Sequence, residues 1–236
     1  MVSITPEQSL PSSIDTWLVL DTEFVSSRAG NQPFQVAIFA YRLVGHHLVK
    51  INEFSVYVLL KHGLQLNYYA KKTTGITEAK LARYGILPAD AAVQLLQFLL
   101  TFPFATTALV GWDPTNDKRM LHLLLSAEEE WSEIARLFPW IDISAFYLYR
   151  SEKGSLCTPS LQDACELEGL TAIDYHDAEG DALATAALLE VLLVRHGVEH
   201  VLRLKRPERK PRYRKQRNGS NEPSIPHESQ EKSDPK

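Results

Sequence analysis

Two carboxylates interrupt an apolar, strand-like run near the start of the chain. The run reads Trp-Leu-Val-Leu-Asp-Thr-Glu-Phe from Trp17 to Phe24, and Asp21 and Glu23 stand two positions apart in it. Side chains alternate between the faces of a strand, so both carboxylates are expected on one face. Two like charges held close together in a core-building strand repel each other and resist burial. A divalent cation would remove both objections, although an Asp-x-Glu pair also occurs at solvated strand ends.

The composition is that of a globular protein with one substantial domain. The chain has 236 residues, of which 44% are hydrophobic and 23% charged. No apolar run approaches the ~20 residues that span a bilayer, and the first fifteen residues lack the pattern of a secretory signal. Cys157 and Cys165 are too few for a disulfide framework or a zinc site, and we expect free thiols. We therefore expect a cytoplasmic protein that contacts no membrane.

The formal net charge of −4 is unevenly distributed along the chain. Residues 203–217 hold nine Lys or Arg and one acid, residues 218–236 hold four acids and two lysines, and residues 1–202 hold 24 acids against 14 bases. An acidic body with a basic extension fits a metal-dependent enzyme that acts on a polyanion, while a solvated tail without a partner is the alternative. Prolines, charge and missing apolar periodicity predict a disordered tail.

The pattern of apolar residues predicts an α/β fold in which strands come first. Strands are expected near 17–23, 34–43, 48–59, 105–111 and 140–143. Helices are expected at 89–100, after Asp113-Pro114, near 144–149, at 160–167 and at 178–195, with a loop at 152–159. Asp113 is the expected N-cap, with Pro114 at the first helical position. We expect a sheet that is partly antiparallel at its start, within a domain at 16–202 between a lead-in (1–15) and the tail (203–236).

Two further acidic signals follow the opening pair. A buried strand at 105–111 leads to a helix whose first turn presents Asp117, and His176 stands just before a helix that presents Asp181 one turn in. Each has an ordinary explanation when taken alone. An Asp in a first helical turn favours the helix dipole, and a histidine before a helix is more often a capping or surface residue than a base.

The order and context of these residues resemble the DEDDh exonucleases. This DnaQ-like family includes polymerase proofreading subunits and RNase T-type enzymes and has an RNase H-like fold, which implies a mixed sheet of about five strands flanked by helices. The resemblance extends to Thr-Gly-Ile-Thr at 74–77, to Ser-Leu-Gln-Asp-Ala at 160–164, and to the run from His176 to Thr185, which follows His-x-Ala-x-x-Asp-Ala-x-Ala-Thr. It covers about residues 16–194.

The second motif departs from the family pattern. The family reads Gly-His-Asn before the acidic helix, whereas this chain has Gly111-Trp112-Asp113. Asp113 can replace the Asn as a helix cap, but Trp112 cannot supply the hydrogen bonds of a histidine. Asp117 falls at the family's catalytic spacing, with Asp113 as the alternative ligand. A tyrosine base defines a sister class, but Tyr175 lacks that class's spacing to Asp181.

The resemblance implies a two-metal site for phosphodiester hydrolysis. Two Mg²⁺ or Mn²⁺ ions suit oxygen ligands and would supply the nucleophile and the charge neutralisation that the reaction needs. Asp21 would bridge both ions, Glu23 and Asp181 would complete the site of the attacking water, and Asp117 would help position the second ion. The catalytic set would thus be Asp21, Glu23, Asp117, Asp181 and His176, with His176 as the general base because an imidazole titrates near neutral pH.

The resemblance also places the substrate after the first motif. Thr22, Phe24 and Val25 are the expected nucleotide contacts, and Phe24 and Val25 could instead be core residues. The implied activity is 3′→5′ hydrolysis of single-stranded DNA or RNA to nucleoside 5′-monophosphates. A non-catalytic nucleic-acid-binding or polymerase-accessory protein that retains the fold is the alternative. The sequence also allows a homodimer, or a polymerase or repair partner that binds the C-terminal tail.

Overall fold

The computed structural model describes residues 14–28, 30–127, 131–152, 155–170 and 175–204. Residues 1–13 of the expected lead-in (1–15) and residues 205–236 of the expected tail (203–236) lie outside these ranges. None of the helices in the described ranges combines the length and the apolar composition needed to cross a bilayer.

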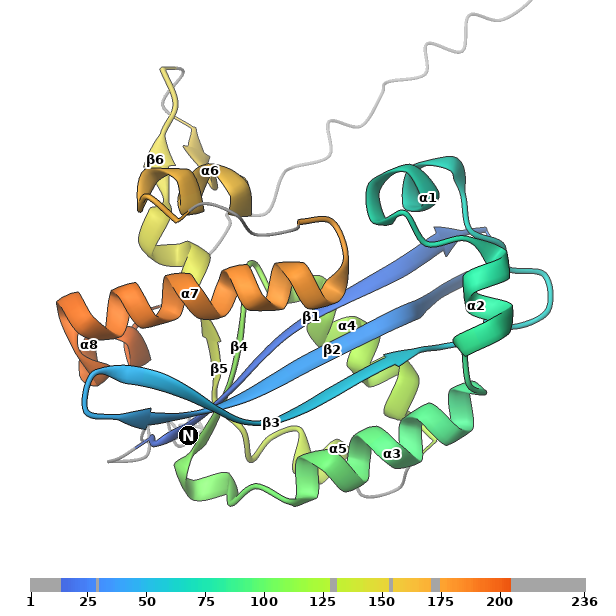
Figure 1. Cartoon of the computed structure of the whole chain (residues 1–236), viewed down its shortest axis with the longest axis horizontal. Coiled ribbons are helices and arrows are strands. Elements are labelled where there is room, and N and C mark those ends of the chain that lie inside the picture. Colours follow the sequence, from blue (N-terminus) through green and yellow to red (C-terminus); the bar gives the residue numbers. More distant parts are fainter. Residues whose placement is uncertain (1–13, 29, 128–130, 153–154, 171–174, 205–236) are drawn as a thin grey trace, which may run out of the picture. The chain divides into compact units, whose positions relative to one another are not determined.

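Five strands form one mixed sheet in the order β3-β2-β1-β4-β5 (Figure 1). In its antiparallel half, β2 (Gly30–Val44) pairs with β1 (Thr16–Ser27) on one side and with β3 (His47–Tyr57) on the other. In its parallel half, β4 (Thr107–Gly111) runs along β1, and β5 (Trp140–Asp142) runs along β4. The expected α/β class and the five-stranded sheet, antiparallel at its start, are confirmed.

Both faces of the central strand β1 are covered, because its alternating side chains enter two different cores. Trp17 and Val19 belong to a core with the buried face of α7 (Ala178–His196). Leu18 and Leu20 belong to a second core with α3 (Pro88–Leu100) and α4 (Thr115–Leu125). Figure 1 shows α7 on one side of the sheet and α3 and α4 on the other, so the sheet lies between two helical layers.

Two short helices that the sequence patterns did not predict follow β3. They are α1 (Tyr68–Thr74) and α2 (Glu78–Tyr84), and the Thr-Gly-Ile-Thr run at 74–77 joins them. Gly75 ends α1 with a φ of +67°, a left-handed conformation that suits glycine, and Thr77 caps α2 by accepting a hydrogen bond from the Lys80 N–H. The family motif is therefore a helix–helix joint.

Several expected elements differ in detail from the structure. The segment expected as a helix at 144–149 instead contains most of a short 3₁₀ helix, η2 (Ile143–Tyr147), and its last residue, Tyr149, begins a short strand. The loop expected at 152–159 contains β7 (Leu156–Cys157), which pairs with β6 (Tyr149–Arg150). Two-residue strands are too short to carry a readable alternation, which is why sequence patterns miss them. The remaining helices are α5 (Trp131–Ile134), α6 (Leu161–Leu167), α8 (Val198–Leu202) and the 3₁₀ helix η1 (Phe104–Thr106).

Candidate metal centre

Three carboxylates meet where β1 passes beneath the first turn of α7. Asp21, Glu23 and Asp181 each place one carboxylate oxygen within 4.8 Å of the others. Asp21 and Glu23 continue the odd-numbered series of Trp17 and Val19, so they lie on the face of β1 that α7 covers. The structure thus brings Asp181 to two residues that precede it by 158 and 160 positions in the sequence, as the resemblance to the DEDDh exonucleases implied.

A buried glutamine ties the start of α7 to the sheet. Gln35 is the partner of Glu23 in the β1–β2 register and is fully buried, and its Oε1 accepts a hydrogen bond from the Ala178 N–H at 3.2 Å. Its Nε2 has no hydrogen-bond partner among the described residues. Asp177 caps the same helix by accepting from the Gly180 N–H at 2.8 Å. These two bonds set the position of Asp181 relative to Glu23. The sequence analysis missed Gln35, although a polar residue inside an apolar strand was the available signal.

Asp117 approaches from the other helical layer. It lies in the first turn of α4, is 5% exposed, and its Oδ1 accepts a hydrogen bond from the Thr22 hydroxyl at 2.7 Å. Thr22 stands between the two acids of β1 in the sequence, so this bond holds Asp117 beside the strand. Asp117 is not part of the 4.8 Å cluster, but its charge acts on both Asp21 and Glu23.

Asp113 is not the helix cap that the sequence predicted. The helix α4 begins at Thr115, and Pro114 occupies the N-cap position without a side-chain cap bond. Asp113 instead adopts a φ of +50°, its N–H donates to Asp142 Oδ1 at 3.2 Å, and its Oδ1 accepts from the Thr115 hydroxyl at 3.3 Å. Aspartate tolerates this left-handed conformation better than most residues, and the contact with the end of β5 stabilises it. As the alternative ligand, Asp113 lies outside the 4.8 Å cluster.

His176 lies at the rim of the acidic cluster. Its side chain is exposed, and its backbone N–H donates to Asp181 Oδ1 at 3.2 Å. Its φ is +81°, which for a residue other than glycine costs on the order of 1–3 kcal/mol and is found mainly at functional sites. The backbone of His176 is therefore bonded to the carboxylate of Asp181, and the residue is exposed to solvent.

Burial raises the pKa values of all four carboxyl groups around the cluster. Burial, followed by the charges of Asp117, Glu23 and Asp181, raises the pKa of Asp21 well above its ordinary value. Burial and the charge of Asp181 raise the pKa of Glu23 to about 8, and burial raises that of Asp117 to about 6. Burial also raises the pKa of Asp181, against the hydrogen bond from His176. An all-oxygen donor set of this kind fits a hard divalent cation, which would let these groups ionise together.

The three expected substrate contacts have different surroundings. Thr22 is 5% exposed and its hydroxyl is bonded to Asp117. Val25 is 1% exposed and packs in a small third core with Phe34 and Ile76, which is the packing alternative that the sequence left open. Phe24 follows a register shift in the β1–β2 pairing and stays partly exposed. Among the three, Phe24 is the side chain that is open to a ligand.

Trp112, which stands in place of the family histidine, is a packing residue. It is partly buried against the core beneath α7, and its ring centroid lies 5.6 Å from that of Tyr147 in η2. The preceding Gly111 is required by close contact, because a Cβ atom there would lie 2.8 Å from the Pro114 Cβ. The tryptophan that replaces the family histidine is thus accommodated by packing against its neighbours.

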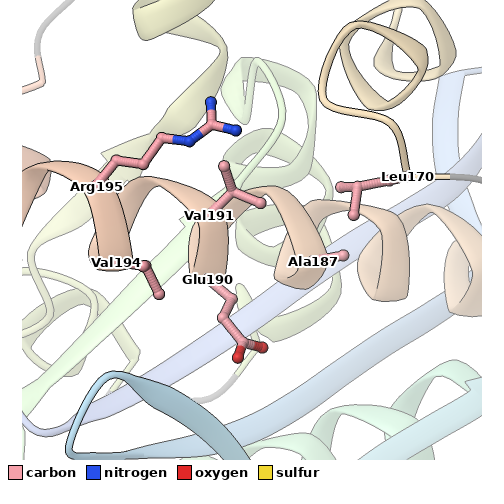
Figure 2. A pocket seen from close by; sticks show the side chains of 6 residues that line it. All are labelled: Leu170, Ala187, Glu190, Val191, Val194 and Arg195. Atoms are coloured by element: carbon pink, nitrogen blue, oxygen red, sulfur yellow. The ribbon is translucent and has the colours of Figure 1, made fainter.

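A pocket on the outer side of α7 is separate from the acids. Figure 2 shows its lining, which consists of Leu170, Ala187, Glu190, Val191, Val194 and Arg195. Ala187 is six residues, or about 9 Å of helix, beyond Asp181. The charges of the lining are already paired, since Glu190 contacts His47 at 2.8 Å and Arg195 contacts Glu168 at 2.5 Å. None of the expected site residues lines this pocket.

Comparison with known proteins identifies the family. The family model described as Exonuclease (RNase_T) matches residues 18–189, which is most of the chain. The chain belongs to this exonuclease family. The expected DEDDh, RNase H-like class is therefore confirmed. A search of curated protein sequences gave no significant match.

Solved structures share the fold at low sequence identity. E. coli exonuclease I in complex with a dT13 oligonucleotide is 19% identical, with a TM-score of 0.61 over 77% of this chain and 41% of that chain. The zinc-bound complex of the E. coli enzyme with single-stranded DNA is 18% identical, with a TM-score of 0.62 over 78% and 41%. Exonuclease I from Methylocaldum szegediense is 17% identical, with a TM-score of 0.61 over 77% and 41%. This chain spans about two fifths of the length of these structures.

The raised carboxyl pKa values predict how stability depends on pH. The folded state holds a proton on Glu23 up to about pH 8, whereas the unfolded state releases it near its ordinary value of 4.5. Without divalent cations, the free energy of unfolding should therefore fall as the pH rises through this range. Urea unfolding in EDTA at pH 5 and pH 8 measures the loss.

Metal should reverse this loss by binding the ionised site. At a Mn²⁺ concentration of a hundred times Kd, the expected gain is about 2.7 kcal/mol. Glu23→Gln should flatten the pH dependence, whereas Glu199→Gln, which changes an exposed acid of α8, should not. If stability at pH 8 does not respond to millimolar Mn²⁺, the cluster is not a metal site.

Proposed function

We propose that this protein is a metal-dependent 3′→5′ exonuclease that releases nucleoside 5′-monophosphates from the 3′ ends of single-stranded DNA or RNA. The observation that carries the proposal is the convergence of Asp21, Glu23 and Asp181 within 4.8 Å in a chain of the exonuclease family. Burial and mutual repulsion raise the pKa values of these half-buried carboxyl groups, so grouping them lowers the stability of the fold when they are ionised. A scaffold that binds no cation would gain nothing from this arrangement.

The carboxylates would hold two Mg²⁺ or Mn²⁺ ions. Asp21, Glu23 and Asp181 would form the first position, and Asp117 would serve the second with Asp21, whose pKa responds to the charge of Asp117 more than to any other. When bound, two such ions activate water, neutralise charge at the phosphorus and stabilise the leaving oxygen. The chain itself fixes the acids: Thr22 orients Asp117, and Gln35 and Asp177 position the helix that carries Asp181.

His176 would act as the general base. The backbone bond to Asp181 holds it beside the cluster, and its exposed ring can take the proton of the attacking water and pass it to solvent. Phe24 would stack on the terminal base, since an aromatic contact tolerates any base and would leave the choice between DNA and RNA to other residues. Thr22 and Val25 would support the site from within.

The direct test uses single strands labelled at the 5′ end. With Mg²⁺ or Mn²⁺, 3′→5′ hydrolysis should give a ladder of progressively shorter labelled DNA or RNA, and EDTA should abolish it. Asp21→Asn should lose the activity while remaining folded. Immediate release of a labelled mononucleotide would show the opposite direction. A purified protein that binds strands without cleaving them would support the non-catalytic alternative.

Losing His176 and losing Asp181 should have separable effects. A general base contributes typically about 10²- to 10⁴-fold, so His176→Ala should lower turnover by that factor and keep the stabilisation by Mn²⁺. Asp181→Asn removes a ligand and should lose both. The comparison needs turnover and thermal unfolding of each variant at several Mn²⁺ concentrations. If His176→Ala weakens the response to Mn²⁺ as much as Asp181→Asn does, His176 is a ligand and not the base.

The basic tail should affect affinity more than chemistry. A segment that neutralises phosphates makes the logarithm of single-strand affinity fall with the logarithm of salt concentration, with a slope of about −0.7 per contact. A chain that ends after Leu204 keeps this residue against the core beneath α7 and removes the remaining basic residues. We expect it to have a flatter salt dependence and nearly unchanged turnover on short oligonucleotides. Equal slopes for both chains would assign the tail to solubility, or to a dimer, polymerase or repair contact.

A further inference from the structure

An exposed aromatic and basic surface lies on the two short helices after β3. Tyr68 and Tyr69 of α1 are 70% and 76% exposed, and their rings are in edge contact with centroids 5.7 Å apart. Lys72 is exposed and follows Tyr68 by four residues and Tyr69 by three, so it lies on the same side of the helix as both. We call Tyr68, Tyr69 and Lys72 the α1 surface.

The segment around this surface is basic within an acidic body. Residues 61–84 hold five Lys or Arg and one acid, whereas the rest of residues 1–202 holds nine bases against 23 acids. Its single acid, Glu78, pairs with Lys71 at 2.5 Å and so links α2 to α1. Lys72 carries no such ion pair among the described residues. The α1 surface therefore offers an exposed positive charge and two exposed aromatic rings.

This segment is attached directly beside the catalytic acids. Leu66, Ile76 and Leu81 from its loops and helices pack with Val25, which lies two residues, or about 7 Å of strand, beyond Glu23. On α2, Lys80 lies 4.8 Å from the Tyr57 ring centroid. A hydrogen bond with Tyr57 raises the pKa of Lys80, and the charges of Asp177 and Glu179 at the start of α7 add to this effect. The α1–α2 segment therefore borders the site along the continuation of β1 (Figure 1).

We infer that the α1 surface binds the single strand on the 5′ side of the nucleotide being removed, by stacking bases on Tyr68 and Tyr69 and contacting a phosphate with Lys72. The inference rests on the proposed function and assigns to it a second binding site, separate from the metal centre. Aromatic rings next to a free cation are the combination that binds single strands irrespective of sequence. A protein partner could also cover exposed tyrosines, but the local excess of positive charge favours a polyanion.

The test compares long and short substrates. Tyr68→Ala/Tyr69→Ala should bind a 5′-fluorescein-labelled dT15 in EDTA at least about 25-fold more weakly than the unchanged protein, because each of the two stacked bases contributes about 5- to 100-fold. With Mn²⁺, the same variant should have a raised KM and an unchanged kcat for dT15. For a trinucleotide too short to reach α1, its kcat/KM should be unchanged. Lys72→Ala should reduce the salt slope by about 0.7.

Two controls make the result decisive. Tyr68→Phe/Tyr69→Phe keeps the rings and should retain affinity, and Tyr149→Ala removes a tyrosine of β6 that is 53% exposed and should change nothing. If the unchanged protein cleaves dT15 but the double alanine variant binds it equally well, the inference is overturned, the proposed function stands, and the tyrosines are left to a protein partner. If the unchanged protein cleaves no strand, the proposed function fails instead.

Discussion

The repulsion between Asp21, Glu23 and Asp181 is the constraint that the rest of the fold must overcome. Two like unit charges about 4 Å apart repel each other by on the order of 4 kcal/mol near a protein surface. Here three carboxylates each have an oxygen within 4.8 Å of the others. Packing opposes this cost, because each fully buried leucine contributes about 1.5–3 kcal/mol and α7 buries Leu188, Leu189, Leu192 and Leu193 against the sheet. The acids are held by a helix that cannot move away without exposing its core. A bound divalent cation would replace this repulsion with attraction.

The position of the acids on the sheet could be predicted because it follows from a local rule. The two-residue period of a strand puts Asp21 and Glu23 on the face of Trp17, and the helical pattern puts Asp181 one turn into α7. Their meeting depends on topology, which the family resemblance implied and the sheet order confirmed. Their roles as metal ligands stay a prediction, because a set of carboxylates does not show which ion it holds.

Other features depend on contacts that no local pattern contains. Asp113 does not cap α4. Its N–H donates instead to Asp142, which lies 29 positions away at the end of β5. Packing for Val25 depends on Ile76 and Leu81, which belong to a segment that sequence patterns did not resolve. The sequence did not predict these two helices, because α1 has no buried residue and α2 has only Leu81. Neither helix therefore shows apolar periodicity.

The distribution of charge relates the metal centre to the surface beside it. A site with four carboxylates in an acidic body repels a phosphate backbone until cations are bound, so such a site cannot by itself guide a strand towards the metals. The α1–α2 segment has the opposite sign and is anchored through Val25 on the same strand as Asp21 and Glu23. Its attraction does not require bound metal. In the proposed function, binding the strand beside the site and hydrolysing it within the site would thus depend on different residues. Salt should then weaken the first, while divalent cations should control the second.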